Sequence, residues 1–323
     1  MQLEDYRIYR GGAYVRYGDA KVGLLTHGLN YGTGCFEGIR GYWNADRKQL
    51  YFFRLLEHFQ RLEQSAKLLL ITLPATSAEL CEHTVQLARL NDLRQDVYVR
   101  PLAFKAAEEV GVRLHNVRDD FAIIMVPHKS YFDGMQGLRT CISSWKRVDD
   151  NAAPARAKLT GIYVNSAIAK TEAVSNGFDE AILLTNDGHV AEGSAENLFM
   201  VRHGAVITPP VTDAILEGIT RSTLIHLCRV ELGMQVIERS VDRSELYGAD
   251  EIFLSGTAVG VGPVIEVDRR PIGSGKIGKV AGALQRLYDE ITRGDEPRYR
   301  HWLTPAFSAE AAAAAAPQKV AAS

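Results

Sequence analysis

The sequence predicts an α+β fold in two parts. Strand-like and helix-like segments are mixed, without the regular strand–helix–strand order that a doubly wound parallel sheet requires. Residues 127–137 gather Gly, Pro and Asp between periodic segments, which indicates a boundary. With 323 residues the chain is long enough for two cores. We therefore expect a smaller N-terminal α/β domain over residues 1–126, an interdomain loop over 127–137 and a larger, β-rich C-terminal domain over 138–295.

The N-terminal part begins with strands and continues with helices. Between residues 7 and 54, short apolar runs bounded by Gly, Asn and Asp predict strands. From Leu55 the apolar residues recur at helical spacing. A second helix is predicted from Ser77, which opens a Ser-x-Glu cap, to Leu90. The segments DVYVRPLAF and DFAIIMVP then predict two longer strands.

The C-terminal part combines strands and helices less regularly. The strand pattern LRTCISSW precedes a segment with one lysine and a helix predicted over residues 163–176. A meander of strands follows, turned at an Asn-Asp-Gly and a His-Gly sequence. After a further helix and two strands, an amphipathic helix is predicted over 279–292. The Ala-rich end, residues 296–323, has little to pack and is predicted to be a disordered tail.

Composition excludes several classes of protein. A net charge of -2 provides no basic surface for nucleic acid. No apolar run is long enough to span a membrane, and the start, MQLEDYRIYR, is unlike a targeting peptide. Four cysteines without a CxxC pair are typical of reduced thiols in a cytoplasmic protein. Nine histidines without close metal spacing predict no metal site.

The stretch GSGKIG at residues 273–278 matches the G-x-G-x-x-G pattern of dinucleotide sites. Such a site needs a strand before it and a βαβ unit around it. Here a polar turn precedes the pattern, and one helix and the tail follow. We therefore interpret it as a glycine-rich turn before the last helix. A nicotinamide oxidoreductase built on these glycines is the alternative from a different class.

One lysine stands in unusual surroundings. Lys158 lies among Ala, Leu, Thr and Gly, and an amine that is poorly hydrated is favoured in its neutral, nucleophilic form. Tyr163 can reach the same place if Gly161 turns the chain. A lone lysine of this kind is also common as a structural or exposed residue, so the pattern alone does not decide.

Three further segments carry groups that suit a phosphorylated cofactor. Glu192 opens a polar stretch of small residues, and Gly218 precedes the hydroxyl residues of a helix start. Residues 255–258, Ser-Gly-Thr-Ala, end a strand with free backbone N–H groups. A solvated turn or a simple helix cap would explain each segment separately. Together with the lysine, an acid and two anion-binding turns are what pyridoxal phosphate requires.

With these groups, the chain resembles the fold-type IV pyridoxal-phosphate enzymes, and among them the branched-chain amino acid aminotransferases. The resemblance covers about residues 5–290, and the FEGIRGY stretch favours this branch over relatives acting on D-amino acids or aminodeoxychorismate. Eight motifs carry it, in order: HGLNYGTGCFEGIRGY (27–42), FRLLEHFQRLEQSAK (53–67), YVRPL (98–102), SSWKR (143–147), ARAKLTGIY (155–163), EGSAENLF (192–199), LEGITR (216–221) and SGTA (255–258).

The resemblance implies a role for each matched residue. Lys158 would be the Schiff-base lysine and the catalytic proton carrier. Further residues would hold pyridoxal 5'-phosphate: Arg61, Tyr163, Glu192, Gly218, Ile219, Thr220, Ser255, Gly256 and Thr257. The substrate would meet Tyr31, Phe36, Gly38, Arg40, Tyr98, Arg100, Val112, Tyr131, Thr257 and Ala258. In the family the site lies between domains at a dimer interface, so Tyr31 and the loop 110–112 would come from the neighbouring subunit.

The implied reaction moves an amino group from leucine, isoleucine or valine to 2-oxoglutarate, giving a branched 2-oxo acid and L-glutamate. The partners would be small amino acids, 2-oxo acids and at least one further copy of the chain. A D-amino acid or (R)-amine transaminase, an aminodeoxychorismate lyase and a non-catalytic relative that stores cofactor are the alternatives on this fold. His128, Ile162 and Gly260 depart from residues common in the family, which leaves the substrate range open.

Overall fold

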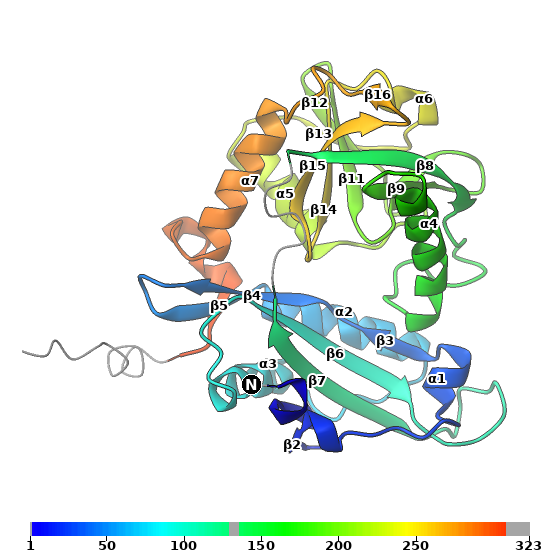
Figure 1. Ribbon diagram of the computed structural model, residues 1–323, viewed down its shortest axis with the longest axis vertical. Coiled ribbons are helices and arrows are strands. Elements are labelled where there is room, and N and C mark those ends of the chain that lie inside the picture. Colours follow the sequence, from blue (N-terminus) through cyan, green and yellow to red (C-terminus); the bar gives the residue numbers. More distant parts are fainter. Residues whose placement is uncertain (1, 129–135, 308–323) are drawn as a thin grey trace, which may run out of the picture.

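The computed structural model describes residues 2–128 and 136–307, which form two lobes, each built around a β-sheet (Figure 1). The lower lobe in that view carries the N-terminal strands and helices α2 and α3. The upper lobe carries most of the second half of the chain, with α4 and α7 on opposite sides of its sheet. The predicted mixture of helices and sheets without regular alternation is therefore confirmed as α+β.

The sheet of the N-terminal lobe is antiparallel throughout the described residues. Its strand order is β17-β5-β4-β6-β7-β1-β2, with β3 beside β6. Strands β6 and β7 form the longest pair, from Val97 opposite Pro127 to Lys105 opposite Asp119. The strands are β1 (Arg7–Arg10), β2 (Ala13–Arg16), β3 (Gly34–Phe36), β4 (Ile39–Asn44), β5 (Gln49–Phe53), β6 (Val97–Lys105), β7 (Asp119–Pro127) and β17 (Leu303–Pro305).

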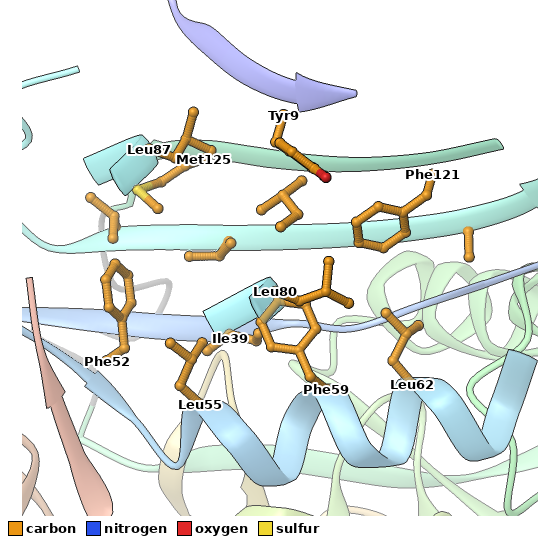
Figure 2. Close-up of a cluster of buried hydrophobic side chains, with 14 of the residues drawn as sticks. Tyr9, Ile39, Phe52, Leu55, Phe59, Leu62, Leu80, Leu87, Phe121 and Met125 are labelled. Carbon is orange, nitrogen blue, oxygen red and sulfur yellow. The ribbon is translucent and has the colours of Figure 1, made fainter. Parts of the chain in front are cut away.

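Helices α2 (Leu55–Leu68) and α3 (Ser77–Leu90) cover one face of this sheet. Leu55, Phe59 and Leu62 recur on one side of α2, and Figure 2 shows them pointing toward the apolar side chains of the strands. All three are almost fully buried, so this stripe anchors the helix on the sheet. The N-terminus of α2 and its Arg61 thereby acquire a fixed position.

The predicted cap of α3 was one residue too late. Thr76, not Ser77, has the extended backbone of an N-cap, and its side chain accepts a hydrogen bond from the Glu79 N–H. The Glu79 carboxylate in turn accepts from the Thr76 N–H, which completes a capping box. Ser77 is already helical.

The sheet of the C-terminal lobe closes on itself. Its order is β10-β9-β8-β15-β14-β11-β12-β13, with β16 on β15, and an additional pairing joins β10 to β11. That pairing, Glu192 opposite Asn197, closes β10, β9, β8, β15, β14 and β11 into a barrel. The strands are β8 (Leu138–Lys146), β9 (Glu180–Leu184), β10 (Val190–Gly193), β11 (Asn197–Arg202), β12 (Ala205–Thr208), β13 (Val236–Glu238), β14 (Glu251–Gly256), β15 (Gly260–Val267) and β16 (Arg270–Pro271).

Alternate residues of β11 enter different apolar clusters. Leu198 and Met200 pack with the barrel strands, whereas Phe199 and Val201 pack against helices α5 and α7. This alternation is what a sheet buried on both faces requires. The remaining described helices are α1 (His27–Tyr31), α4 (Tyr163–Ser175), α5 (Ile219–Val230), α6 (Arg243–Leu246) and α7 (Lys279–Thr292), with 3₁₀ turns at Leu3–Asp5, Tyr17–Asp19, Thr160–Ile162 and Pro297–Trp302.

Helix α7 has the bounds that its sequence pattern predicts, and the glycine-rich stretch before it is a turn. Gly273 and Gly275 adopt positive φ angles, and Gly278 is the N-cap of α7. The strands before and after α7 belong to different sheets, β16 to the C-terminal sheet and β17 to the N-terminal one, so no βαβ unit surrounds the stretch within the described residues. The interpretation as a turn is confirmed.

The prediction of a disordered tail from residue 296 was wrong for its first part. Residues Pro297–Trp302 form a 3₁₀ helix, and β17 pairs with β5 of the N-terminal sheet. Phe307 is buried, and the Gln49 side chain donates to its carbonyl and accepts from its N–H. Aromatic side chains at Tyr299 and Trp302 stack and provide apolar surface that the Ala-rich composition concealed. Residues 308–323 lie outside the described residues.

Within residues 2–128 and 136–307, the structure contains no helix long and apolar enough to traverse a bilayer. The predicted interdomain loop lies largely outside the described residues, and Tyr131 lies outside them too.

Candidate functional site

The backbone of the lysine segment is held against the N-terminal lobe. The Ser65 hydroxyl accepts from the Lys158 N–H (3.2 Å), and the Lys158 carbonyl accepts from the Phe36 N–H (3.0 Å). Just beyond, a Cβ on Gly32 would lie 2.7 Å from the Gly161 Cα, and Gly32 has a φ of +66°. Only glycine permits this approach with that backbone. The lysine is therefore fixed on both sides of its own residue.

The Lys158 side chain reaches Tyr163. Its Nζ lies 2.6 Å from the Tyr163 hydroxyl oxygen, because the Thr160–Ile162 turn folds the chain back before α4 begins. The ring of Phe36 lies 5.2 Å from the Nζ and 4.8 Å from the Tyr163 ring. The predicted approach of the two polar groups through the Gly161 break is confirmed.

Glu192 lies at the barrel closure and is almost fully buried. Its carboxylate faces the Arg147 guanidinium at 2.9 Å and accepts from the Asn197 amide (2.9 Å) and the Leu216 N–H (3.1 Å). Burial raises the pKa of this carboxyl, and the Arg147 charge and the Leu216 hydrogen bond only partly oppose that effect. A carboxylate offers about four acceptor positions, so three protein donors leave one. Glu192 can therefore accept one further N–H from a ligand.

Two backbone turns lie near Glu192. Gly218 is the N-cap of α5, so the first N–H groups of that helix have no intrahelical acceptor and point outward. A Cβ on Gly218 would lie 2.0 Å from the Asn197 Oδ1, which makes glycine necessary there. The second turn follows β14. Near the end of that strand, the Ser255 hydroxyl is buried and has no hydrogen-bond partner among the described residues. Both turns present donors suited to an anion.

All the residues predicted to hold the cofactor line one cavity. These residues are Arg61, Lys158, Tyr163, Glu192, Gly218, Ile219, Thr220, Ser255, Gly256 and Thr257. They come from α2, the lysine segment, β10, the start of α5 and the end of β14. The sequence separated them widely, and the fold collects them at the junction of the two lobes.

A second cavity adjoins the first and contains six of the predicted substrate residues. Phe36, Gly38, Tyr98, Arg100, Thr257 and Ala258 line it, together with Lys158 and Tyr163. The Arg100 guanidinium donates to the Tyr98 hydroxyl (2.8 Å) and lies over the Phe36 ring (4.3 Å). A Cβ on Gly38 would lie 2.3 Å from the Tyr98 hydroxyl oxygen, so this glycine leaves room for the tyrosine.

Among the other predicted substrate residues that the structure describes, Arg40, Tyr31 and Val112 do not line this cavity. The buried Arg40 pairs with the half-buried Asp96 at 3.1 Å and lines a neighbouring cavity, because the Asp96 carboxylate attracts the guanidinium there. Tyr31 is exposed and its hydroxyl accepts from the Gly111 N–H (3.1 Å), and Val112 is 77% exposed. Neither Tyr31 nor Val112 lines either cavity of its own chain, so their predicted part in a neighbouring subunit stays a prediction.

The sequence reasoning missed two charged residues around the cavity. Arg147 lies in the matched SSWKR motif, but nothing in the local pattern revealed its partner Glu192. Glu37 is fully buried and pairs with Arg61 through two 2.8 Å hydrogen bonds. An acidic residue inside the apolar FEGIRGY run was the available signal. In the part of the chain that the structure describes, no group of three or more His, Cys, Asp or Glu could hold a metal ion.

Comparison with known proteins identifies the family. A family model described as amino-transferase class IV matches residues 34–267, which include both cavities. This chain is a class IV aminotransferase.

Individual relatives of this class IV aminotransferase agree over nearly the whole chain. A probable branched-chain-amino-acid aminotransferase of Aquifex aeolicus is 46% identical over 303 residues, covering 94% of this chain and 97% of the relative. The branched-chain aminotransferase of Thermoproteus uzoniensis, solved with norvaline, has a TM-score of 0.89 at 41% identity, covering 94% of this chain and 99% of that one. The branched-chain amino acid aminotransferase of Thermobaculum terrenum, solved in its PLP form, has a TM-score of 0.91 at 39% identity, covering 95% and 100%.

Proposed function

We propose that this class IV aminotransferase uses pyridoxal 5'-phosphate to transfer the amino group of leucine, isoleucine or valine to 2-oxoglutarate. The products would be the branched 2-oxo acid and L-glutamate. The observation that carries the proposal is that Lys158 and Tyr163 border both cavities. One basic side chain can thus face a cofactor on one side and a substrate on the other. The names of the relatives point to the same reaction.

The residues of the first cavity fit the cofactor. The free N–H groups at the start of α5, the unpartnered Ser255 hydroxyl and Arg61 supply donors for a phosphate. Glu192 has an acceptor position for a protonated ring nitrogen, and Tyr163 has a hydroxyl for the ring oxygen. When bound, pyridoxal phosphate supplies an electron-withdrawing ring that stabilises negative charge at the substrate Cα.

Lys158 is the acid–base group of the chain in this proposal. Its Nζ takes a proton from the substrate Cα and returns one in the opposite half-reaction. The hydrogen bond with Tyr163 and the backbone contacts of Ser65 and Phe36 hold the amine in one place. Orientation of this kind accounts for a large share of the rate gained by a positioned base.

Glu192 keeps a proton on the ring nitrogen in this proposal. Burial raises the pKa of this carboxyl because its negative charge is poorly solvated, so an ionised Glu192 gains from pairing with the positive charge of a protonated ring nitrogen. Arg147 and the Leu216 N–H keep the carboxylate oriented toward the cavity. Their combined effect is a fixed, buried acceptor.

The second cavity suits both kinds of side chain that the reaction requires. Phe36 and Leu102 provide apolar wall for a branched side chain. Arg100 provides a cation for the second carboxylate of glutamate or 2-oxoglutarate. Its contacts within the described residues are the Tyr98 hydroxyl and ring and the Phe36 ring, with no carboxylate among them.

The central test separates the two half-reactions. L-Leucine alone should convert the absorption spectrum of the cofactor-loaded protein, and 2-oxoglutarate alone should restore it. Borohydride reduction followed by peptide mapping should locate the cofactor on Lys158. An unchanged spectrum with either substrate, or a label on another residue, would contradict the proposal. A donor panel with both enantiomers separates it from a D-amino acid or (R)-amine transaminase, and release of ammonia or pyruvate without an acceptor would indicate a lyase.

We also infer that the protein is a cytoplasmic homo-oligomer, at least a dimer. Large apolar side chains are exposed around α1, where Leu24 is 86%, Leu29 is 62% and Val110 is 83% accessible. Tyr31 and the loop 110–112 lie in the same region and would complete the partner's substrate cavity. All four cysteines are free thiols, as a reducing compartment requires.

Mixing two inactive variants tests the shared site. Lys158→Ala removes the base, and Tyr31→Ala removes the side chain that is proposed to complete the substrate cavity of the neighbouring subunit. A hybrid dimer would contain one intact site, so refolding both together should recover about a quarter of the wild-type activity. If the mixture stays as inactive as its components, Tyr31 does not act across an interface.

A further inference from the structure

Glu37 is a buried acid that the proposed reaction does not use. It lies between β3 and β4 and its side chain is fully buried. Its carboxylate accepts from the Arg61 Nε (2.8 Å), the Arg61 Nη2 (2.8 Å) and the His58 Nδ1 (2.8 Å). Three short contacts on one buried carboxylate form a closed cluster, which we call the Glu37 cluster: Glu37, His58 and Arg61.

The ionisation of the Glu37 cluster follows from its contacts. Burial works to raise the Glu37 pKa, but the Arg61 charge and the hydrogen bonds from His58 and Arg61 outweigh it and hold the pKa well below the usual range. Burial lowers the pKa of His58, against the opposing effect of Glu37. At neutral pH the histidine is therefore neutral, and its Nδ1–H donates to an ionised Glu37.

These contacts determine which part of the Arg61 guanidinium is free. A guanidinium has five N–H donors. Glu37 takes the Nε–H and one on Nη2, and the Glu217 carbonyl accepts one from Nη1 (2.9 Å). One N–H remains on each terminal nitrogen, and the two together form a fork that matches a pair of phosphate oxygens.

Without Glu37, the Arg61 side chain could adopt a second position. Arg61 also borders a groove on the outer side of α2, which Glu57 and Glu217 line as well. Carboxylates there could draw the guanidinium away from the cofactor cavity. The buried Glu37, on the inner side of α2, holds the guanidinium and prevents this movement.

We propose that Glu37, supported by His58, is a positioning residue that aims the free fork of Arg61 at the phosphate group of the cofactor. The inference rests on the proposed function, because it requires a phosphorylated cofactor in the first cavity. Glu37 could affect phosphate binding in two opposite ways. If repulsion between its negative charge and the phosphate dominated, removing the charge would strengthen phosphate binding. If its orientation of Arg61 dominates, as we propose, removing the charge weakens phosphate binding.

The test compares pyridoxal phosphate with pyridoxal, which lacks the phosphate. In Glu37→Gln an amide N–H faces the Arg61 Nη2–H, so one of the two hydrogen bonds is lost and the fork is misdirected. We expect the affinity of the apoprotein for pyridoxal phosphate to fall about 10- to 100-fold, as for other residues that orient a ligand-binding group. The affinity for pyridoxal should be unchanged. Titration followed by absorbance measures both without any turnover.

Two controls separate positioning from general damage. Glu57→Gln changes a carboxylate on the same helix that pairs with Arg54, and it should leave both affinities unchanged. His58→Asn keeps an N–H donor near the Nδ1 position and should retain most of the phosphate-dependent affinity, whereas His58→Leu should lose it. This pair decides the matter even if Glu37→Gln does not fold.

The outcomes are distinct. Equal weakening of both ligands would mean that Glu37 only supports the fold, and tighter binding of pyridoxal phosphate would mean that its charge dominates. Either result overturns the proposal. A wild-type protein that binds neither ligand would instead refute the proposed function itself.

Discussion

Replacing Arg100 by leucine should separate the two substrates of the proposed reaction. The side chain lies in the second cavity, where its guanidinium contacts the Tyr98 hydroxyl and the Phe36 ring. Leucine retains apolar volume beside Phe36 but removes the cation. A branched side chain loses no polar contact, while a second carboxylate loses its partner.

The size of the effect follows from the contacts. A hydrogen bond to a charged group contributes about 1.5–3 kcal/mol, so kcat/KM for 2-oxoglutarate should fall roughly 10- to 150-fold. The folded state loses the cation–ring contact, worth about 0.5–2 kcal/mol. It loses no ion pair, because the contacts of Arg100 within the described residues include no carboxylate. The protein should therefore stay folded.

The assay measures kcat/KM for 2-oxoglutarate and for 4-methyl-2-oxovalerate with the same enzyme preparation. Arg100→Lys should lie between wild type and Arg100→Leu, since it keeps the charge without the planar fork. Arg139→Leu, which removes an exposed arginine paired with Asp179, is the matched control and should change neither value. Equal losses for the two acceptors in Arg100→Leu would refute the assignment of this residue to the second carboxylate.

Three further predictions concern the lysine segment and acid stability. Gly32→Ala should lower the melting temperature and deplete bound cofactor, because its Cβ would lie 2.7 Å from the Gly161 Cα at a φ of +66°; a normal melting curve would argue against this close approach. Tyr163→Phe should reduce kcat about 10- to 100-fold by removing the hydrogen bond to Lys158, with KM for leucine little changed in steady-state assays. Hydrogen bonds from Arg239 lower the Glu245 pKa from 4.5 to about 2, so the stability from this carboxylate is present above pH 4.5 and lost as the pH falls toward 2. Acid unfolding should accordingly be less steep in Glu245→Gln than in wild type, and identical pH profiles would show that the pair contributes nothing.

Local patterns were sufficient where the forces that shape an element act within a few residues. The bounds of α7 follow from its apolar spacing, and the glycine-rich turn before it follows from the missing strand–helix–strand unit. The resemblance of the ordered motifs to the family named all the cofactor residues, and the structure places them around one cavity. The lysine and its tyrosine could be paired because a single break separates them.

Contacts between distant segments were decided by packing. Glu37 and Arg147 meet their partners, Arg61 and Glu192, only when each lobe folds, because each pair joins segments far apart in the sequence. The strength of such an attraction depends on which charged groups the fold buries together. Charge attraction also explains why Arg40 pairs with Asp96 and does not line the substrate cavity, although its motif matched the family as well as the others.

The sequence by itself determined the family, the two kinds of element and the chemical groups available to the reaction. Only the tertiary structure decided which edge of Arg61 stays free, which face of the chain carries Tyr31 and where the last strand returns to the first sheet. These depend on contacts between residues far apart in the chain, and such contacts leave no periodic trace in the sequence.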